Sequence, residues 1–200
     1  MAGSYPPPHY NEPDFEAHLQ LMREQPLATF IVADSDVPFA TPLPLVLAHS
    51  ASLKAGFSEK GNQMQLLGHL DANNPAADLI QDGREVLAIY HGPNAYISPT
   101  DYHTKGRLPT YNYKQVFVRG KLQRLTDHAD VQADLHALVK VMEPEGKWDI
   151  SNDDPRIKAL LPHIVGFRIH VESVTGRFKL SQDKVKADRE AAMQKLTGKL

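Results

Sequence analysis

Residues 90–113 read YHGPNAYISPTDYHTKGRLPTYNY, and this stretch decides how the chain must fold around it. It holds five of the chain's seven tyrosines, together with three prolines, two glycines and two basic residues. Because proline has a fixed φ and no backbone N–H, the stretch cannot be one regular strand or helix throughout, and we expect a shaped loop in its middle. The faces and polar tips of Tyr102, Tyr111 and Tyr113 suit a planar polar ring system. The alternative is a turn-rich corner whose tyrosines cap the core.

Apolar and β-branched runs at short spacing surround this stretch and predict strands. The expected strands cover residues 27–33, 37–48, 63–70, 85–90, 113–125 and 164–174. Asp34, Ser35 and Asp36 form the first hairpin turn, and residues 60–62 form a second turn. Prolines bend the strand at 37–48, and a bulge is expected near Gly120.

Helical periodicity places helices between and after these strands. The expected helices cover residues 13–24, 75–81 and 155–161, the span that carries Val131, Leu135, Leu138 and Met142, and a terminal segment after Asp183 that ends near Gly198. Short strands with turns between them and helices at the ends predict a mainly β barrel or sandwich with flanking helices.

The composition is that of an ordinary globular protein, with 42% hydrophobic and 23% charged residues, and we expect one domain over residues 1–200. No apolar run approaches the roughly 20 residues that a membrane-spanning helix needs, and no secretory signal is visible, so a cytoplasmic protein is expected. The formal net charge of −2 provides no overall attraction to nucleic acid, although a local basic patch stays open.

The common enzyme templates are missing from the sequence. Ten histidines occur without a metal-binding spacing, and His128 and His136 are expected at solvated helix positions. There is no cysteine and no nucleophile elbow, so Ser98 and Ser181 have no recognisable base. Rossmann and P-loop glycine motifs are also absent. No catalytic residue and no metal ligand is therefore predicted.

Polar islands at strand ends remain as candidates for a binding cleft. They are GHLDANNP at residues 68–75, the tyrosine-rich stretch, and GRFKLSQ at residues 176–182. Together they could hold a phosphate and a heteroaromatic ring. A purely structural interpretation stays open, with helix caps at residues 73–75 and Ser181 and a turn at Gly176.

The sequences of these polar segments resemble those of the PaiB-type family of FMN-binding negative transcriptional regulators. The matching motifs are PFATPLP at 38–44, LLGHL at 66–70, NP at 74–75, GPNAYISP at 92–99, PTYNY at 109–113 and KLSQ at 179–182. The resemblance implies an FMN-binding split β-barrel, a Greek-key antiparallel barrel of the pyridoxamine phosphate oxidase type. It also implies a homodimer with the ligand cleft and FMN at the subunit interface.

The resemblance also indicates which residues bind FMN. They are His69, Asn73, Asn74, Tyr96, Ser98, Lys105, Pro109, Thr110, Tyr111, Asn112, Lys179, Ser181 and Gln182. Tyr96 or Tyr111 is expected to flank the isoalloxazine ring. The chain departs from the family pattern at Pro42, Asp71-Ala72, Asp101, Tyr111 and Asp183.

The departure at Asp71-Ala72 bears directly on the phosphate. Relatives carry an Ala-Arg pair there, so a bidentate donor is replaced by a repelling carboxylate. The cations that could replace it are His69, Lys105, Arg107 and Lys179.

Three functions follow as hypotheses. The first is a non-enzymatic regulator or redox-sensing protein that binds FMN, and the alternative is a flavin-dependent oxidoreductase acting on a small substrate. Direct DNA binding is the third, but the charge balance does not support it, because Asp188 and Glu190 interleave with the basic residues of the terminal segment.

Overall fold

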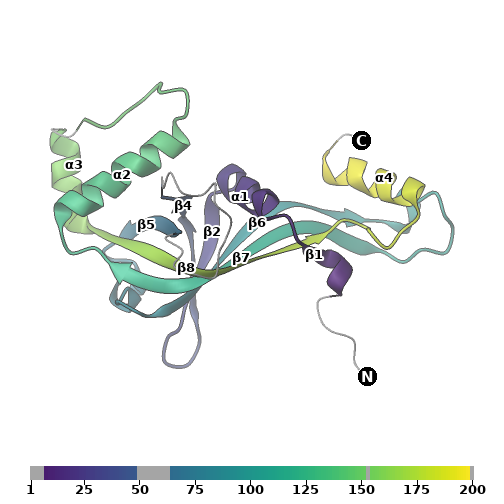
Figure 1. The fold of residues 1–200 in the computed structure, drawn as a ribbon, viewed down its shortest axis with the longest axis horizontal. Coiled ribbons are helices and arrows are strands. Elements are labelled where there is room, and N and C mark those ends of the chain that lie inside the picture. Colours follow the sequence, from purple (N-terminus) through teal and green to yellow (C-terminus); the bar gives the residue numbers. More distant parts are fainter. Residues whose placement is uncertain (1–6, 49–63, 152–153, 199–200) are drawn as a thin grey trace. The chain divides into compact units, whose positions relative to one another are not determined.

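The computed structural model describes residues 7–48, 64–151 and 154–198, which form a mainly β structure with flanking helices (Figure 1). The elements are η1 (Pro8–Tyr10), β1 (Asn11–Glu12), α1 (Phe15–Glu24), β2 (Leu27–Val32), β3 (Phe39–Pro44), β4 (Val46–Leu47), β5 (Gln65–Asp71), η2 (Pro75–Leu79), β6 (Glu85–Ile97), η3 (Pro99–Asp101), β7 (Thr110–Arg124), α2 (His128–Met142), α3 (Pro155–Leu160), η4 (Leu161–His163), β8 (Ile164–Lys179) and α4 (Lys186–Leu196). The strands pair in the order β3-β2-β6-β7-β8-β5-β4, and β1 pairs with β8. No helix of the described ranges is long and apolar enough to cross a lipid bilayer.

The chain divides into two compact units. Unit 1 comprises Met1–Gln25, Ile89–Phe117 and Val174–Leu200, and unit 2 comprises Pro26–Ala88 and Val118–Ser173. The strands β6, β7 and β8 each contribute residues to both units. A single domain over residues 1–200 stays a prediction.

Alternating burial along β2 supplies part of the core of unit 2. In β2, Ala28, Phe30 and Val32 are buried while their neighbours are less so, which is the period of two expected of a strand with one face on a core. The strand pairs with β3 in antiparallel register from Leu27↔Pro44 to Val32↔Phe39. The fully buried rings of Phe30 and Phe167 lie 5.4 Å apart and form the centre of this core.

The helix α2 covers a second apolar cluster in unit 2. Asp127 caps its first turn by accepting a hydrogen bond from the N–H of Ala129 at 2.8 Å. One turn apart on the same face, Val131 and Leu135 pack with Leu125 in this cluster.

Unit 1 contains β6 from Ile89, β7 up to Phe117 and β8 from Val174, together with α1 and α4. The helix α1 buries Leu19, Leu21 and Met22, and Asp14 caps it. The helix α4 contributes Ala192 to a separate cluster, in which it packs with Ile97 and Tyr102.

Most expected elements occur close to their expected ranges, but the strand expected at 37–48 is wrong as one element. It is divided into β3 and β4, and the N–H of Leu45 between them donates to the carbonyl of Pro26 at 2.9 Å. Pro42 and Pro44 lie inside β3, paired with Thr29 and Leu27 of β2, so they do not cause the break. The chain changes its partner here, because β3 pairs with β2 and β4 pairs with β5. The turn expected at residues 60–62 lies outside the described residues.

Two strands continue further than the sequence indicates. The strand β6 runs through Pro93 to Ile97, and β8 runs through Gly176 to Lys179, so the turn expected at Gly176 is wrong. A side chain at Gly176 would overlap the ring of His18, so the glycine is required by close packing within a strand. The loop of the tyrosine-rich stretch is therefore residues 98–109.

The structure also bears on the expectations for two histidines of α2 and for Gly120. His128 is exposed as expected. His136 is half-buried, and its buried Nε2 atom has no hydrogen-bond partner among the described residues, so the solvated position expected for His136 is wrong in part. Gly120 lies inside β7, where an added Cβ would overlap the carbonyl oxygen of His170. Close approach of two strands accounts for this glycine, and the bulge near it stays a prediction.

Candidate functional site

A cavity of about 320 Å³ opens in unit 1, between the loop that precedes β7 and the segment that follows β8. Its size is at the lower end of ordinary ligand pockets, which span roughly 300–1,000 Å³. The lining residues are Tyr10, Gly106, Arg107, Leu108, Pro109, Thr110, Lys179, Ser181, Asp183 and Lys184. Four of the predicted FMN-binding residues, Pro109, Thr110, Lys179 and Ser181, are thus brought to one cavity.

Local sequence chemistry shapes the loop on the first side of the cavity. Ser98 begins it with a capping box, in which its Oγ accepts from the N–H of Thr100 at 3.2 Å and its own N–H donates to Asp101 at 2.7 Å. Gly106 turns the chain at a φ of 77°, a conformation that favours glycine. Ser98 therefore lies at the start of the loop as a cap, and its predicted contact with FMN stays a prediction.

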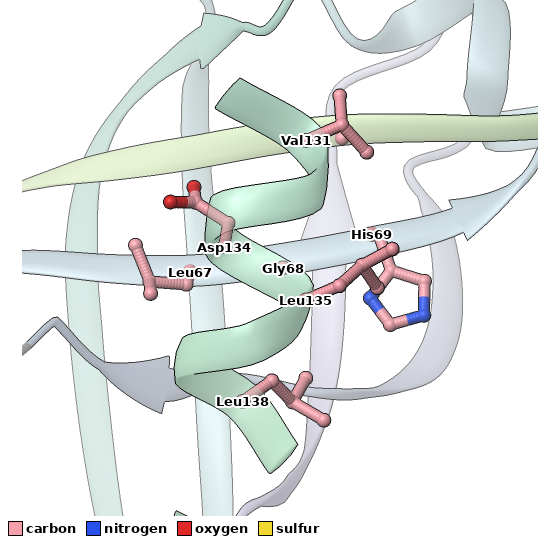
Figure 2. Close-up of a pocket in the computed structure, with 8 residues that line it drawn as sticks. Leu67, Gly68, His69, Val131, Asp134, Leu135 and Leu138 are labelled. Atoms are coloured by element: carbon pink, nitrogen blue, oxygen red, sulfur yellow. The ribbon is translucent and has the colours of Figure 1, made fainter. Parts of the chain in front are cut away.

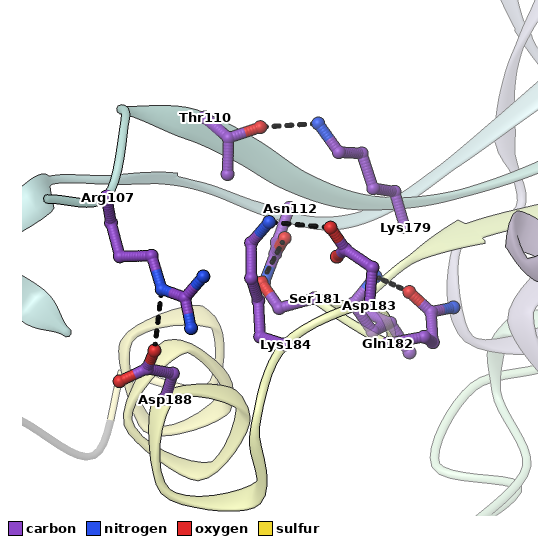
Figure 3. A network of polar contacts seen from close by, with 10 residues as sticks. Arg107, Thr110, Asn112, Lys179, Ser181, Gln182, Asp183, Lys184 and Asp188 are labelled. Carbon is purple, nitrogen blue, oxygen red and sulfur yellow. Dashed lines mark hydrogen bonds and ion pairs between the residues drawn. The ribbon is translucent and has the colours of Figure 1, made fainter. Parts of the chain in front are cut away.

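The cations of the cavity differ in how far they are neutralised (Figure 3). The Nζ of Lys184 lies 2.6 Å from the Oδ2 of Asp183, and the Nε of Arg107 lies 3.0 Å from the Oδ2 of Asp188. Lys179 instead donates to the Oγ1 of Thr110, and its Nζ lies 5.8 Å from the centre of the Tyr10 ring. Among the described residues no carboxylate pairs with Lys179, so its positive charge is available to a ligand.

The titration of these groups keeps the cavity charged at neutral pH. The hydrogen bond to Asp183 raises the pKa of Lys184, so this ammonium stays protonated. Burial is the largest single influence on the pKa of Asp183 and raises it, but the hydrogen bond and the charge of Lys184, with smaller contributions, together bring the pKa below its ordinary value. Burial, followed by the Asp183 charge, raises the pKa of Tyr10, so its hydroxyl remains a neutral donor.

Behind the cavity, Ser181 and Asn112 form a buried polar contact. Ser181 has a φ of 60°, the one positive φ of a non-glycine residue in the described ranges, and its Oγ donates to the Oδ1 of Asn112 at 3.1 Å. The Nδ2 of Asn112 is buried and has no partner in the described chain. Gln182 holds the neighbouring turn, because it accepts from the N–H of Leu180 at 2.6 Å and donates to the carbonyl of Phe178.

A pair of tyrosine rings lies on the neighbouring strands. The rings of Tyr96 and Tyr111 are 5.6 Å apart in an edge-to-face arrangement, and the residues are 49% and 56% exposed. Because successive side chains of a strand point to opposite faces, Tyr111 faces away from Thr110 and the cavity. Lys105 is exposed and makes no hydrogen bond or ion pair with a described residue.

The other three predicted site residues belong to unit 2. His69 lines a small cavity of about 10 Å³, enough for about one water molecule, together with Asp134 of α2 (Figure 2). Burial lowers the pKa of His69, so its ring is neutral at neutral pH. It therefore provides no positive charge in place of the arginine that the family resemblance leads us to expect near this position.

The predicted asparagines Asn73 and Asn74 make local contacts. The backbone N–H and the Nδ2 of Asn73 donate to the Oδ1 of Asp71 at 2.7 and 2.9 Å. Asn74 caps η2 by accepting from the N–H of Ala76 at 2.9 Å. Their binding to FMN stays a prediction.

Residues beyond the predicted set complete the cavity. Arg107 was recognisable only as one of several cations, and Lys184 only as part of a charged tail. Tyr10 and Asp188 gave no signal, because each reaches the site from a distant part of the chain. Their roles depend on tertiary packing, which no local pattern encodes.

The residues of unit 1 fit the two recognisable parts of FMN. Lys179, Arg107 and the hydroxyl of Thr110 are donors suited to a phosphate monoester, and Asp183 is already paired with Lys184. The exposed faces of Tyr96 and Tyr111 suit an aromatic ring system. When bound, FMN would supply a redox-active ring to the protein.

Comparison with known proteins gives the fold and the family. The chain is 27% identical over 195 residues to the Bacillus subtilis (strain 168) "Protease synthase and sporulation protein PAI 2", covering 96% of this chain and 88% of that protein. The FAD and heme binding protein of Mycobacterium smegmatis superposes with a TM-score of 0.62 at 11% identity, covering 92% of this chain and 80% of that one. The flavocytochrome Anf3 of Azotobacter vinelandii has a TM-score of 0.59 at 12% identity, with 85% and 69% covered.

These structural likenesses identify the fold as a split β-barrel of the pyridoxamine phosphate oxidase type. The model of the family described as "Putative FMN-binding domain" matches residues 4–173. That range includes Arg107 and Thr110 but ends before Lys179 and the helix α4. The chain therefore belongs to the FMN-binding domain family, and FMN is its cofactor.

Proposed function

We propose that this protein is a PaiB-type flavin-binding regulatory protein that holds the phosphate of FMN in the cavity of unit 1. The observation that carries the proposal is the un-neutralised charge of Lys179 beside the Thr110 hydroxyl, in a cavity that Arg107 also lines. A charge-assisted hydrogen bond to a phosphate oxygen is about twice as strong as a neutral one. The name of the Bacillus subtilis relative, which refers to protease synthase and sporulation, supports a regulatory role.

The flavin ring is assigned to the tyrosine pair, and this assignment calls for a homodimer. Thr110 and Tyr111 lie on opposite faces of β7, so one FMN bound to a single copy does not easily use both. In the proposed dimer, the phosphate lies in the cavity of one copy and the ring contacts Tyr96 and Tyr111 of the second copy. The 81% exposure of Leu108 at the rim of the cavity leaves apolar surface for this contact.

Comparison of FMN with riboflavin tests the phosphate assignment. Riboflavin has the same ring and ribityl chain but lacks the phosphate. The reconstituted protein is expected to bind FMN at least about tenfold more tightly, the value of roughly one charge-assisted hydrogen bond. Equal dissociation constants for the two flavins would contradict the assignment of the phosphate to this cavity. The absence of any flavin-induced thermal stabilisation would contradict the binding of FMN itself.

Sedimentation velocity with and without FMN tests the dimer. The expected result is a dimer in the FMN-bound sample, and a monomer at saturating FMN contradicts the second-copy assignment. Oxidation of NAD(P)H above the free-flavin background would favour the oxidoreductase alternative over a regulator.

Direct DNA binding is tested separately by mobility shift over a salt series, because phosphate-driven binding must weaken as salt rises. A cytoplasmic location stays a prediction from the sequence.

A further inference from the structure

Asp188 of the C-terminal helix α4 is a fully buried carboxylate with an unusual set of partners. Its Oδ1 accepts from the backbone N–H groups of His103 and Thr104, both at 2.9 Å, and its Oδ2 accepts from the Nε of Arg107 at 3.0 Å. A carboxylate removed from water is tolerated only when it is hydrogen-bonded and paired. All three donors come from the loop that forms one side of the cavity, so a single side chain of α4 holds that loop.

The hydrogen bond to Asp188 uses Arg107 in a particular way. The guanidinium group has five N–H donors in one plane, and Asp188 takes only the one on Nε. The two terminal nitrogens donate to no protein atom within the described chain, although the residue lines the cavity and its side chain is only 28% exposed. The guanidinium is thus fixed along one edge while its other donors remain available.

We propose that Asp188 is a positioning residue for the phosphate site. It orients the Arg107 guanidinium and orders residues 103–107. The two terminal nitrogens of Arg107 are thereby aligned to donate two hydrogen bonds to the oxygens of one phosphate monoester. Pre-organisation of this kind removes the entropic cost of ordering a long side chain when the ligand binds. The inference rests on the proposed phosphate site, and it assigns a role in that site to α4, which lies outside the family-matched range 4–173.

Two matched substitutions separate positioning from simple electrostatics. Asp183→Asn and Asp188→Asn each remove one negative charge from the surroundings of the cavity. If charge alone matters, both variants bind FMN more tightly, because a repelling carboxylate is lost. If Asp188 positions Arg107, Asp183→Asn binds FMN more tightly while Asp188→Asn binds it about tenfold more weakly, as for the loss of roughly one charge-assisted hydrogen bond.

Dissociation constants for FMN and riboflavin are measured by flavin fluorescence on the full chain, and inorganic phosphate alone is tested by thermal shift. The expected result for Asp188→Asn is weakened binding of FMN and phosphate with riboflavin binding unchanged. Tighter or unchanged FMN binding overturns the proposal. Equal weakening of FMN and riboflavin also overturns it, because a merely structural defect does not distinguish the two flavins.

Arg107→Lys covers the case in which Asp188→Asn fails to fold. It keeps the positive charge but loses the Nε donor and the planar fork, so FMN binding should weaken about tenfold while riboflavin binding does not change. Unchanged FMN affinity in this variant overturns the proposal. If the unaltered protein does not distinguish FMN from riboflavin, the phosphate site fails together with this inference. If it does distinguish them and both variants keep the same preference for FMN over riboflavin as the unaltered protein, only the positioning role fails.

Discussion

Replacing Lys179 by methionine removes the one cavity cation that no described carboxylate neutralises. Methionine preserves much of the length and apolar volume of lysine but carries no charge. If Lys179 binds the phosphate of FMN, the variant loses a hydrogen bond between two charged groups, worth about 1.5–3 kcal/mol. That free energy corresponds to a dissociation constant for FMN raised roughly 10- to 150-fold. The dissociation constant for riboflavin should change by less than about twofold, because riboflavin has no phosphate for Lys179 to contact.

The assay is fluorescence titration of both flavins at two salt concentrations, since the contribution of a charged contact decreases as salt screens it. Lys195→Met is the matched control, because it removes the same charge from an exposed position outside the cavity lining. Exposed charges contribute little, so its effect on FMN binding should stay within about twofold. The reasoning is refuted if Lys179→Met binds FMN as well as the unaltered protein, or if Lys195→Met weakens FMN binding as strongly.

Three further predictions concern the fold. Gly120→Ala forces a Cβ against the carbonyl oxygen of His170, so urea unfolding should show a loss of about 1–3 kcal/mol, and an unchanged midpoint would contradict the close approach. Phe30→Ala removes a fully buried ring that packs on Phe167, so the free energy of unfolding should fall by about 3–5 kcal/mol in the same assay. A loss below about 1 kcal/mol would contradict this, because it would mean that neighbouring side chains fill the space left by the ring. Burial raises the pKa of Tyr90 above its ordinary value of 10.0, so the folded state retains a proton that the unfolded state loses, and stability should fall as pH rises above that value. Ultraviolet titration should show this tyrosine ionising only together with alkaline unfolding, and reversible ionisation in the folded protein would argue against its burial.

The strand β2 of unit 2 was predictable because its side chains alternate between a buried and a less buried face, whereas β5 and β8 bury the consecutive residues 66–68 and 165–167. In β2 this alternation marks the buried Phe30 directly in the sequence. The extension of β6 through Pro93 was not predictable, because proline is normally read as the end of a strand. Proline is tolerated in a strand wherever its nitrogen is not needed for pairing, and only the tertiary arrangement decides that.

The candidate site was predictable only in part, because tertiary contacts between distant residues form it. The family motifs pointed to Thr110 and Lys179, which the structure places in contact across 69 positions of sequence. The contacts of Asp188 with the loop span 81 to 85 positions. No spacing or periodicity signals such a pairing, and the sequence of α4 indicates only a charged, solvated helix.

The burial of Ile97 and Tyr102 beneath Ala192 has a practical consequence for anyone who trims this chain. A version cut back to residues 4–173 would match the family closely and look like a natural minimal fragment. It would nevertheless lose Lys179 and Asp188, and it would bare two large apolar side chains to solvent. Flavin affinities measured on such a fragment would describe a damaged protein, so ligand screening calls for the intact C-terminal helix.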